Sequence, residues 1–262
     1  MRKIITTFPN KEEFTKAKDY FDTLKLSYEI ISPEPAYELV GVKALVIDSK
    51  TRALLPHDHI NHFMCAGWVN YEEPKSRVPE IYPVEFENDI FGKSVIMALL
   101  PCIADERKMR FIAHISGNLT EVFPYLNTLM KGAEYNKNVP LLTFREEYRI
   151  ITLYPNRISV AKADDIIDSW SILENIRCYA NEVWRKKDQI EPSYETHKKT
   201  PAIEIYKYLP RNNCRLCGEK TCLAFALKLW SGDINIKECK PLFTENYKNL
   251  KELLFQTCTG IE

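Results

Sequence analysis

The sequence predicts an α+β protein in which two small α+β units precede a small, mostly helical domain rich in cysteine. Strand-like and helix-like patterns alternate near the N-terminus, and a series of β-rich runs then leads to one long amphipathic helix. Four of the eight cysteines fall between residues 214 and 239. We therefore expect domains at residues 1–80, 90–190 and 200–262.

Composition and charge are those of an ordinary globular protein. Of the 262 residues, 45% are hydrophobic and 27% are charged, and the formal net charge is zero. General nucleic-acid binders are usually basic, so this balance argues against that class. The longest uncharged apolar run, residues 95–104, is about half of what a membrane-spanning helix needs. The first residues include no apolar stretch of signal-peptide length, and we expect a cytoplasmic protein without membrane insertion.

The first unit is predicted to have a β-α-β-β arrangement. Asn10 is the expected N-cap of its helix, which presents apolar residues on one face. Residues 50–93 are rich in Pro, His, Asn and Glu, so few regular elements are expected there. The four elements are predicted at residues 3–8, 10–24, 27–31 and 43–49.

The second unit is predicted to be an antiparallel sheet covered by helices. Its clearest element is a helix over residues 163–187, and a shorter helix is expected over 119–133. Strands are predicted at residues 93–100, 109–116, 139–144, 147–155 and 157–163. The long helix has a core-facing stripe made of Ile166, Ile167, Trp170, Leu173, Ile176, Tyr179, Ala180 and Trp184.

A polar linker, residues 188–200, precedes the cysteine-rich domain. Short helices are expected to begin at residue 201 and at Cys222, with Gly232 as the C-cap of the second. Residues 241–258 are predicted to form a terminal amphipathic helix.

The spacing Cys214-x2-Cys217-x4-Cys222-x16-Cys239 indicates a metal centre. Four thiolates suit either tetrahedral zinc or a [4Fe–4S] cube. Zinc sites usually pair two short Cys-x2-Cys knuckles, whereas here three ligands lie close together and the fourth is distant, which favours iron–sulfur. A disulfide framework is the least favoured interpretation for a cytosolic chain of this length. The isolated cysteines are read as small buried hydrophobic residues: Cys65, Cys102, Cys178 and Cys258.

Residues beside the cysteines support an anionic cluster. Gly218 permits a tight turn directly after Cys217. Cys222 opens a helix, whose N-terminal N–H groups and partial positive charge favour negative charge. Apolar shielding from water is expected from Phe225, Leu229 and Trp230.

The stretch LPRNNCRLCGEKTCLAFALKLWSGDINIKEC resembles the small four-iron domain of the large subunit of the corrinoid iron–sulfur protein. The same type of domain occurs in electron-transport subunits of anaerobes. The resemblance covers about residues 208–242, and Lys240 stands where that family usually has Pro. The resemblance implies a low-potential [4Fe–4S] cluster that passes single electrons. In the corrinoid protein, such electrons reduce the cobalt back to Co(I). The matching positions are Leu209, Pro210, Asn213, Cys214, Cys217, Gly218, Thr221, Cys222, Phe225, Ala226, Gly232 and Cys239.

A second group of candidate residues lies in PHDHINHFMC, residues 56–65. His57, His59 and His62 form either an ordinary polar loop or a contact to a metal, a corrinoid cobalt or a substrate. The segment does not match the Asp-x-His-x2-Gly corrinoid motif, so we do not expect this chain to carry its own corrinoid.

Basic residues gather around the cysteines, as either a solvated surface or a docking rim for an acidic redox partner. They are Arg211, Arg215, Lys220, Lys228, Lys237 and Lys240.

Two functions are compatible with these features. The first is a small electron carrier that serves a redox partner, such as the cobalt of a corrinoid-dependent methyltransferase in anaerobic metabolism. The second is a regulatory or oxygen-sensing iron–sulfur protein that docks on a large methyltransferase complex. Because the chain shows no flavin or nucleotide motif, we expect a small oxidoreductase or electron carrier rather than a self-contained catalyst. A zinc-bound regulator is the more distant third.

Overall fold

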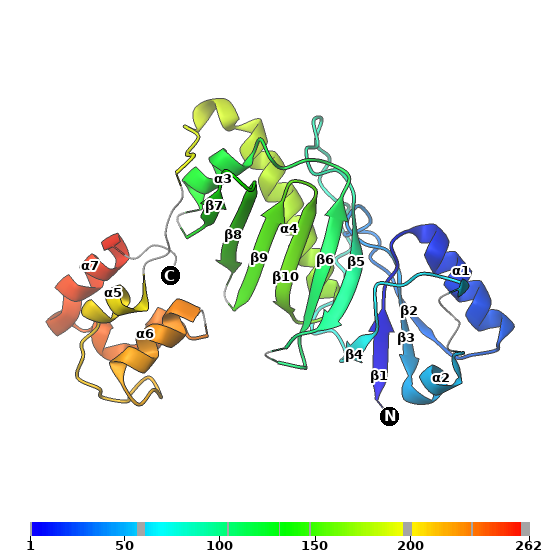
Figure 1. Cartoon of the computed structure of the whole chain (residues 1–262), viewed down its shortest axis with the longest axis horizontal. Helices are drawn as coiled ribbons and strands as arrows, with labels where there is room; N and C mark the ends of the chain where they lie inside the picture. The colour runs from blue at the N-terminus through cyan, green and yellow to red at the C-terminus, as the bar shows by residue number, and fades with distance from the viewer. Residues whose placement is uncertain are drawn as a thin grey trace. The chain divides into compact units, whose positions relative to one another are not determined.

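The computed structural model describes residues 2–56, 61–103, 105–130, 132–146, 148–195, 201–231 and 233–257 (Figure 1). The chain divides into two compact units, Met1–Val122 with Thr152–Ile190, and Phe123–Ile151 with Glu191–Glu262. Helices combine with antiparallel sheets, and a small helical region follows at the C-terminal end. The predicted α+β class is therefore confirmed.

The first sheet is small and antiparallel, with strand order β2-β3-β1-β4. Helix α1, Lys11–Thr23, packs against it through Ala17 and Phe21, which share a core with Leu45 and Ile47. The helix begins where predicted, because the Asn10 side chain accepts a hydrogen bond from the Glu13 N–H at 2.8 Å. The remaining elements are β1 Lys3–Thr6, β2 Glu29–Ile31, β3 Ala44–Asp48, α2 Ser49–Leu54 and β4 Val69–Tyr71.

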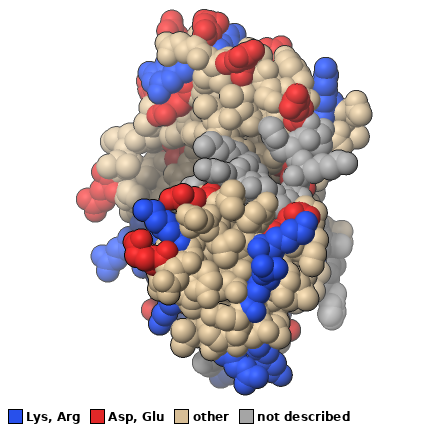
Figure 2. All heavy atoms as spheres, turned by 90° about the vertical axis from the view of Figure 1, so that its left-hand side faces the viewer, with Lys and Arg blue, Asp and Glu red and all other residues tan. Residues whose placement is uncertain are grey.

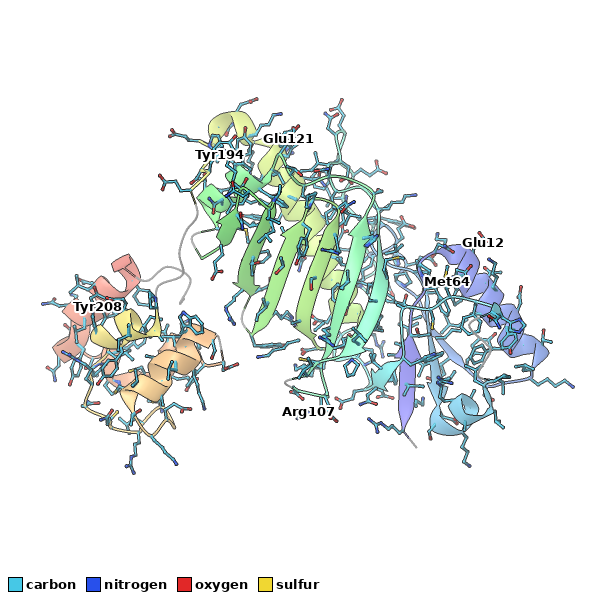
Figure 3. All side chains as sticks on the ribbon, in the orientation of Figure 1. Glu12, Met64, Arg107, Glu121, Tyr194 and Tyr208 are labelled. Atoms are coloured by element: carbon cyan, nitrogen blue, oxygen red, sulfur yellow. The ribbon has the colours of Figure 1, made fainter. Side chains whose placement is uncertain are left out.

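The segment after the histidines is attached to α1. The backbone N–H of Met64 donates to the Glu13 carboxylate at 2.6 Å, and Figure 3 labels Met64 beside Glu12 on this helix. Glu13 is also paired with Lys16 at 2.8 Å. These contacts give residues 61–65 a defined place in a stretch where few regular elements form.

The second sheet has the order β5-β6-β10-β9-β8-β7 (Figure 1). Helix α4, Ile166–Arg185, lies over one face of it. The strands are β5 Ser94–Pro101, β6 Met109–Ile115, β7 Glu134–Asn136, β8 Leu141–Glu146, β9 Arg149–Tyr154 and β10 Arg157–Ala163. The division between the two units falls within β9.

Helix α3, Phe123–Leu129, is shorter than the predicted helix over 119–133. The chain enters it through a turn in which the Leu119 N–H donates to the Pro155 carbonyl, and Pro124 suits the first helical turn because it has no N–H to donate. At the other end, residues 134–136 pair with β8 instead of extending the helix.

The predicted stripe of α4 is correct in part. Ile166, Ile167, Trp170, Leu173, Ile176 and Ala180 are buried, but Tyr179 is 40% exposed and Trp184 is half-buried. Two polar residues, Arg177 and Asn181, are buried on the helix instead.

Arg177 can be buried because two carboxylates balance its charge and one carbonyl accepts a further hydrogen bond. Its guanidinium pairs with Asp89 at 3.0 Å and Glu174 at 2.7 Å, and it donates to the Val84 carbonyl at 2.6 Å. Asn181 donates to the same Asp89 carboxylate at 2.7 Å. Burial would raise the pKa of Asp89, but hydrogen bonds from the Gly92 N–H, Asn181, the Phe91 N–H and Arg177 hold that pKa below its ordinary value. Residues 84–92 are thereby fastened to α4.

The C-terminal region contains α5 Ala202–Lys207, α6 Cys222–Ser231 and α7 Lys248–Thr257. The predicted terminal helix over 241–258 begins only at Lys248. Residues 240–247 form two 3-10 turns separated by extended Thr244, which bring Leu242 into the core. This core contains Ile205, Leu209, Phe225, Ala226, Leu229, Ile236, Leu242 and Leu254. Within the described ranges, no helix has the length and apolarity needed to cross a bilayer.

We predict that Asp89→Asn destabilises the chain by roughly 1–3 kcal/mol, because the buried Arg177 loses a charged partner. The Asp89 carboxylate stabilises the folded chain above its unfolded pKa of about 3.9, and this contribution disappears as the pH falls through the lower folded pKa. Thermal unfolding followed by circular dichroism at pH 7 and pH 3 should show a difference between wild type and variant that shrinks in acid.

Asp105→Asn is the matched control. Asp105 pairs with Arg107 at a similar distance, 3.1 Å, but at an exposed site in the turn between β5 and β6, where Figure 3 labels Arg107. Exposed pairs contribute little, so we expect no measurable loss. Equal melting temperatures for all three proteins at pH 7 would show that the buried network does not stabilise the fold.

Candidate metal centre

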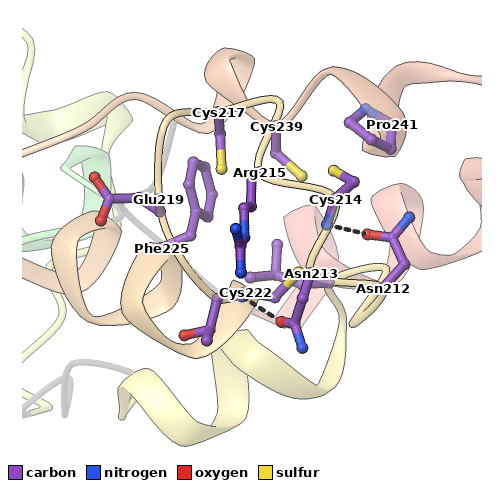
Figure 4. Close-up of a pocket in the computed structure, with 12 residues that line it drawn as sticks. Asn212, Asn213, Cys214, Arg215, Cys217, Glu219, Cys222, Phe225, Cys239 and Pro241 are labelled. Carbon is purple, nitrogen blue, oxygen red and sulfur yellow. Dashed lines mark hydrogen bonds between the residues drawn. The ribbon is translucent and has the colours of Figure 1, made fainter.

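Four cysteines line one pocket in the C-terminal region (Figure 4). They are the four that the spacing singled out, and residues far apart in sequence complete the wall. We call this the cysteine pocket; its lining residues are Leu209, Asn212, Asn213, Cys214, Arg215, Cys217, Glu219, Thr221, Cys222, Phe225, Cys239 and Pro241.

The cysteine loop, residues 213–222, is closed by one hydrogen bond between its ends. The N–H of Cys222 donates to the Asn213 side-chain oxygen at 2.8 Å, drawn as a dashed line in Figure 4. Thr221 begins α6 as predicted for a helix opened by Cys222, since its hydroxyl accepts from the Ala224 N–H at 3.0 Å. Cys214 and Cys217 are thus held beside the first turn of α6.

Cys239 reaches the pocket through packing. It follows a 3-10 turn, Ile236–Glu238, in which Ile236 is 1% exposed. The next 3-10 turn, Lys240–Phe243, buries Leu242 completely. Apolar residues on both sides of Cys239 therefore fix its place, although sixteen residues separate it from Cys222.

Left-handed backbone recurs through this loop. The φ angles are +56° at Arg211, +48° at Asn213, +60° at Arg215 and +83° at Gly218. The space beside Gly218 is open, so its backbone conformation, not crowding, favours glycine there, as the sequence suggested. The repeated left-handed positions turn the chain sharply, so the loop stays compact around its cysteines.

Burial differs among the four thiols. Cys222 and Cys239 are 8% and 5% exposed, Cys217 is half-buried and Cys214 is exposed. Burial raises the pKa of Cys239 to about 11; the Leu242 N–H opposes this, and the neighbouring thiolates of Cys217, Cys222 and Cys214 raise it further. Bringing four thiolates together therefore requires a compensating cation.

The donor set fits a thiophilic metal centre, because sulfur ligands suit zinc and iron–sulfur clusters. All seven described cysteines are free thiols, so no disulfide forms among them. Among the described residues, no three His, Cys, Asp or Glu side chains form a group that would hold a single metal ion.

The predicted residues around the cysteines have different outcomes. Phe225 and Leu229 are buried beside the pocket, whereas Trp230 is 39% exposed. His57 and His59 lie outside the described residues. His62 is exposed and stacks on Tyr20, with ring centroids 4.3 Å apart. Gly232, the expected C-cap, also lies outside the described residues.

Three residues contribute to the pocket in ways that sequence patterns did not predict. Asn213 closes the loop, but it lies nine residues before Cys222, and no local pattern links the two positions. Arg215 lines the pocket from within the Cys-x2-Cys spacing. Glu219 is neutralised by Lys228 at 2.6 Å, so this lysine does not belong to a free basic rim.

Comparisons with known proteins match the same segment. A family model described as "Putative Fe-S cluster" matches residues 209–241. The gamma subunit of the acetyl-CoA decarbonylase/synthase complex of Methanocaldococcus jannaschii is 43% identical over 61 residues, which are 22% of this chain and 12% of that protein. The corresponding subunit of Methanosarcina acetivorans is 49% identical over 53 residues, 20% of this chain and 11% of that protein.

An uncharacterized protein of M. jannaschii is also similar, with 47% identity over 55 residues, 20% of this chain and 25% of that protein. The chain thus spans about an eighth of the gamma subunits that it matches. No solved structure matches. The predicted iron–sulfur character of this segment is confirmed, while the cluster type, its ligands and a corrinoid partner stay predictions.

We predict that Asn213→Ala lowers the free energy of unfolding of the C-terminal region by about 1–2 kcal/mol. The substitution removes the hydrogen bond to Cys222, and alanine tolerates the left-handed backbone less well than asparagine does. Asn213→Gly should cost less, since glycine accepts that backbone. Both variants are purified anaerobically, and their melting temperatures and iron contents are measured.

Asn212→Ala is the control for this test. The Asn212 side chain accepts a longer hydrogen bond, 3.3 Å from the Cys214 N–H, and its backbone has no positive φ. A loss for Asn212→Ala as large as that for Asn213→Ala would contradict the importance of the bond that closes the loop.

Proposed function

We propose that the chain is a low-potential electron carrier whose domain at residues 200–262 holds a [4Fe–4S] cluster through Cys214, Cys217, Cys222 and Cys239. One observation supports this above all: these four thiols line one pocket inside the segment that the iron–sulfur family model matches. Their spacing favours a cube over zinc. The group, when bound, supplies exchange of one electron at a time.

The side chains around the pocket have distinct roles in this proposal. Buried Cys222, Cys239 and Phe225 exclude water from the inner side. Cys214 is exposed, and every residue from 211 to 216 is exposed, so an electron enters or leaves on that side. Gly218 and Thr221 shape the surroundings, one through its backbone and the other as the start of α6.

The redox partner, as we propose it, has an acidic surface and carries the cobalt of a corrinoid-dependent methyltransferase. The relatives named as acetyl-CoA decarbonylase/synthase subunits suggest anaerobic one-carbon metabolism. The docking rim keeps most of its predicted members: Arg211, Arg215, Lys220, Lys237 and Lys240 form no ion pair with any described residue. Lys228 leaves the rim because it pairs with Glu219.

The exposed edge at Cys214 also favours a second candidate, a regulator that responds to oxygen, because an oxidant reaches this side of the pocket. Measuring the reduction of the partner's cobalt distinguishes the two functions. An electron carrier reduces its partner's cobalt at a rate that follows partner concentration, whereas a regulator changes docking on oxygen exposure without electron flow.

We predict that anaerobically purified protein is brown and contains about four iron and four sulfide per chain. Cys222→Ser should lose the cluster, because serine oxygen is a poor replacement for a buried thiolate ligand. Cys178→Ser should keep it: Cys178 lies on α4, its sulfur contacts Glu174 at 3.4 Å, and it has no cysteine neighbour in sequence. Iron, sulfide and zinc analysis with visible absorption measures all three proteins.

Stoichiometric zinc without iron in the wild type would rule out the proposed cofactor. A colourless but folded Cys178→Ser variant would show that the ligands are assigned wrongly.

We also propose that domain 1–80 contacts the partner's corrinoid or its surroundings through His57, His59 and His62. His62 is exposed, so its ring is accessible even while it stacks on Tyr20. Replacing all three by Ala should leave iron content and circular dichroism unchanged while weakening binding to the corrinoid methyltransferase by about tenfold. Wild type and triple variant are each titrated against that protein. Equal affinities and equal cobalt spectra would show that the segment is an ordinary polar loop.

A further inference from the structure

Arg215 has a special place among the basic residues of the C-terminal region. Only two residues lining the cysteine pocket are charged, Arg215 and Glu219. Glu219 is neutralised by Lys228, whose ammonium lies 2.6 Å from its carboxylate. Arg215 forms no ion pair with the residues that the structure describes. It is therefore the unbalanced charge of the pocket wall.

The position of Arg215 combines access to the pocket with freedom to move. Its side chain is exposed, and Figure 4 shows it running between the labelled cysteines in that view. Because no described carboxylate holds the guanidinium, it can turn aside when the pocket is filled without losing an ion pair. Because residue 215 lies between Cys214 and Cys217 in the chain, its side chain remains close to whatever those two thiols hold.

The backbone conformation at Arg215 is unusual for an arginine. Its φ is +60°, in the left-handed region where glycine is more readily accommodated. The carbonyl of Arg215 accepts the Gly218 N–H at 3.0 Å, so the turn itself needs only the backbone of this residue. A side chain at a sparsely populated backbone position suggests a role for that side chain.

We propose that Arg215 raises the reduction potential of the cluster held by the four cysteines. This inference rests on the proposed [4Fe–4S] centre. Four thiolates make such a centre anionic, and reduction adds one electron from the external reductant without forming or breaking a bond. A cation in the pocket wall stabilises the added negative charge, and net charge near the sulfurs is one determinant of cluster potentials.

The other basic residues act more weakly on the cluster. Arg211, Lys220, Lys237 and Lys240 are exposed and do not line the pocket. Because they lie outside the pocket wall, solvent and salt screen their charges from the cysteines more strongly than that of Arg215. Lys228 is neutralised by Glu219. Arg211 is the natural control, because it is also an exposed arginine with a left-handed backbone, at φ +56°.

Redox titration followed by EPR, on the full chain purified anaerobically, tests the proposal. Four variants are compared with wild type: Arg215→Gln, Arg215→Gly, Arg215→Lys and Arg211→Gln. The two neutral variants at position 215 should lower the midpoint potential by similar amounts. Arg215→Lys should stay near wild type, and Arg211→Gln should shift less than Arg215→Gln. The difference caused by Arg215→Gln should shrink in high salt.

Glycine and glutamine both remove the charge of Arg215. Glycine relieves the left-handed backbone, whereas glutamine leaves it as strained as arginine does. A shift in potential that both variants share therefore reports the charge and not the strain. Equal shifts for Arg215→Gln and Arg211→Gln would reduce the effect to general surface charge and overturn the proposal. An unchanged potential in both neutral variants would overturn it as well. Both of these outcomes require that the wild type holds a cluster. If the wild type binds zinc in place of iron, the proposed function itself is wrong.

Discussion

The hydrogen bond between the Cys222 N–H and the Asn213 side chain is the constraint on which the candidate site depends. It joins the two ends of the cysteine loop, so the residues between them are confined to one compact turn. Cys214 and Cys217 lie inside that turn, and Cys222 lies at its end. Without this closure, the loop would be joined to α6 only by the chain itself and by the pairing of Glu219 with Lys228, and two of the four thiols would be less firmly held relative to the third.

The fourth thiol depends on a different force. Cys239 is delivered by the hydrophobic contacts of Ile236 and Leu242, which are buried in the core shared with Phe225 and Leu229. A region of this size has a limited apolar core, and such domains usually gain stability from a bound metal or cluster. The site and the small core therefore support each other: packing brings in Cys239, and a bound cluster would tie the loop to that core.

The sequence predicted those features that depend on local patterns. Asn10 as a cap, most strands of both sheets and the grouping of four cysteines follow from residue spacing, whereas the short strands β4 and β7 were not predicted. Burial of Arg177 was not predictable, because its partner Asp89 is 88 residues away in the chain and an arginine in a helix usually faces water. The short α3 and the late start of α7 depend likewise on tertiary contacts that override helical periodicity.

The bond at Asn213 and the place of Arg215 escaped prediction for a further reason. Both residues have left-handed backbone, a conformation that sequence patterns assign first to glycine. The resemblance identified position 213 as a match to the family pattern but gave no contact for it. Only the folded loop shows that one side chain caps Cys222 and that the other lines the pocket.

Electrostatics connect the local and global properties of the chain. Lys plus Arg and Asp plus Glu are equal in number, 36 of each, so the protein as a whole is neutral. Within residues 209–241, however, Lys and Arg outnumber Asp and Glu. Cys222 also lies at the N-terminus of α6, where the helix dipole adds partial positive charge. A neutral protein thus concentrates positive potential where four thiolates meet, which is the electrostatic environment that an anionic cluster requires.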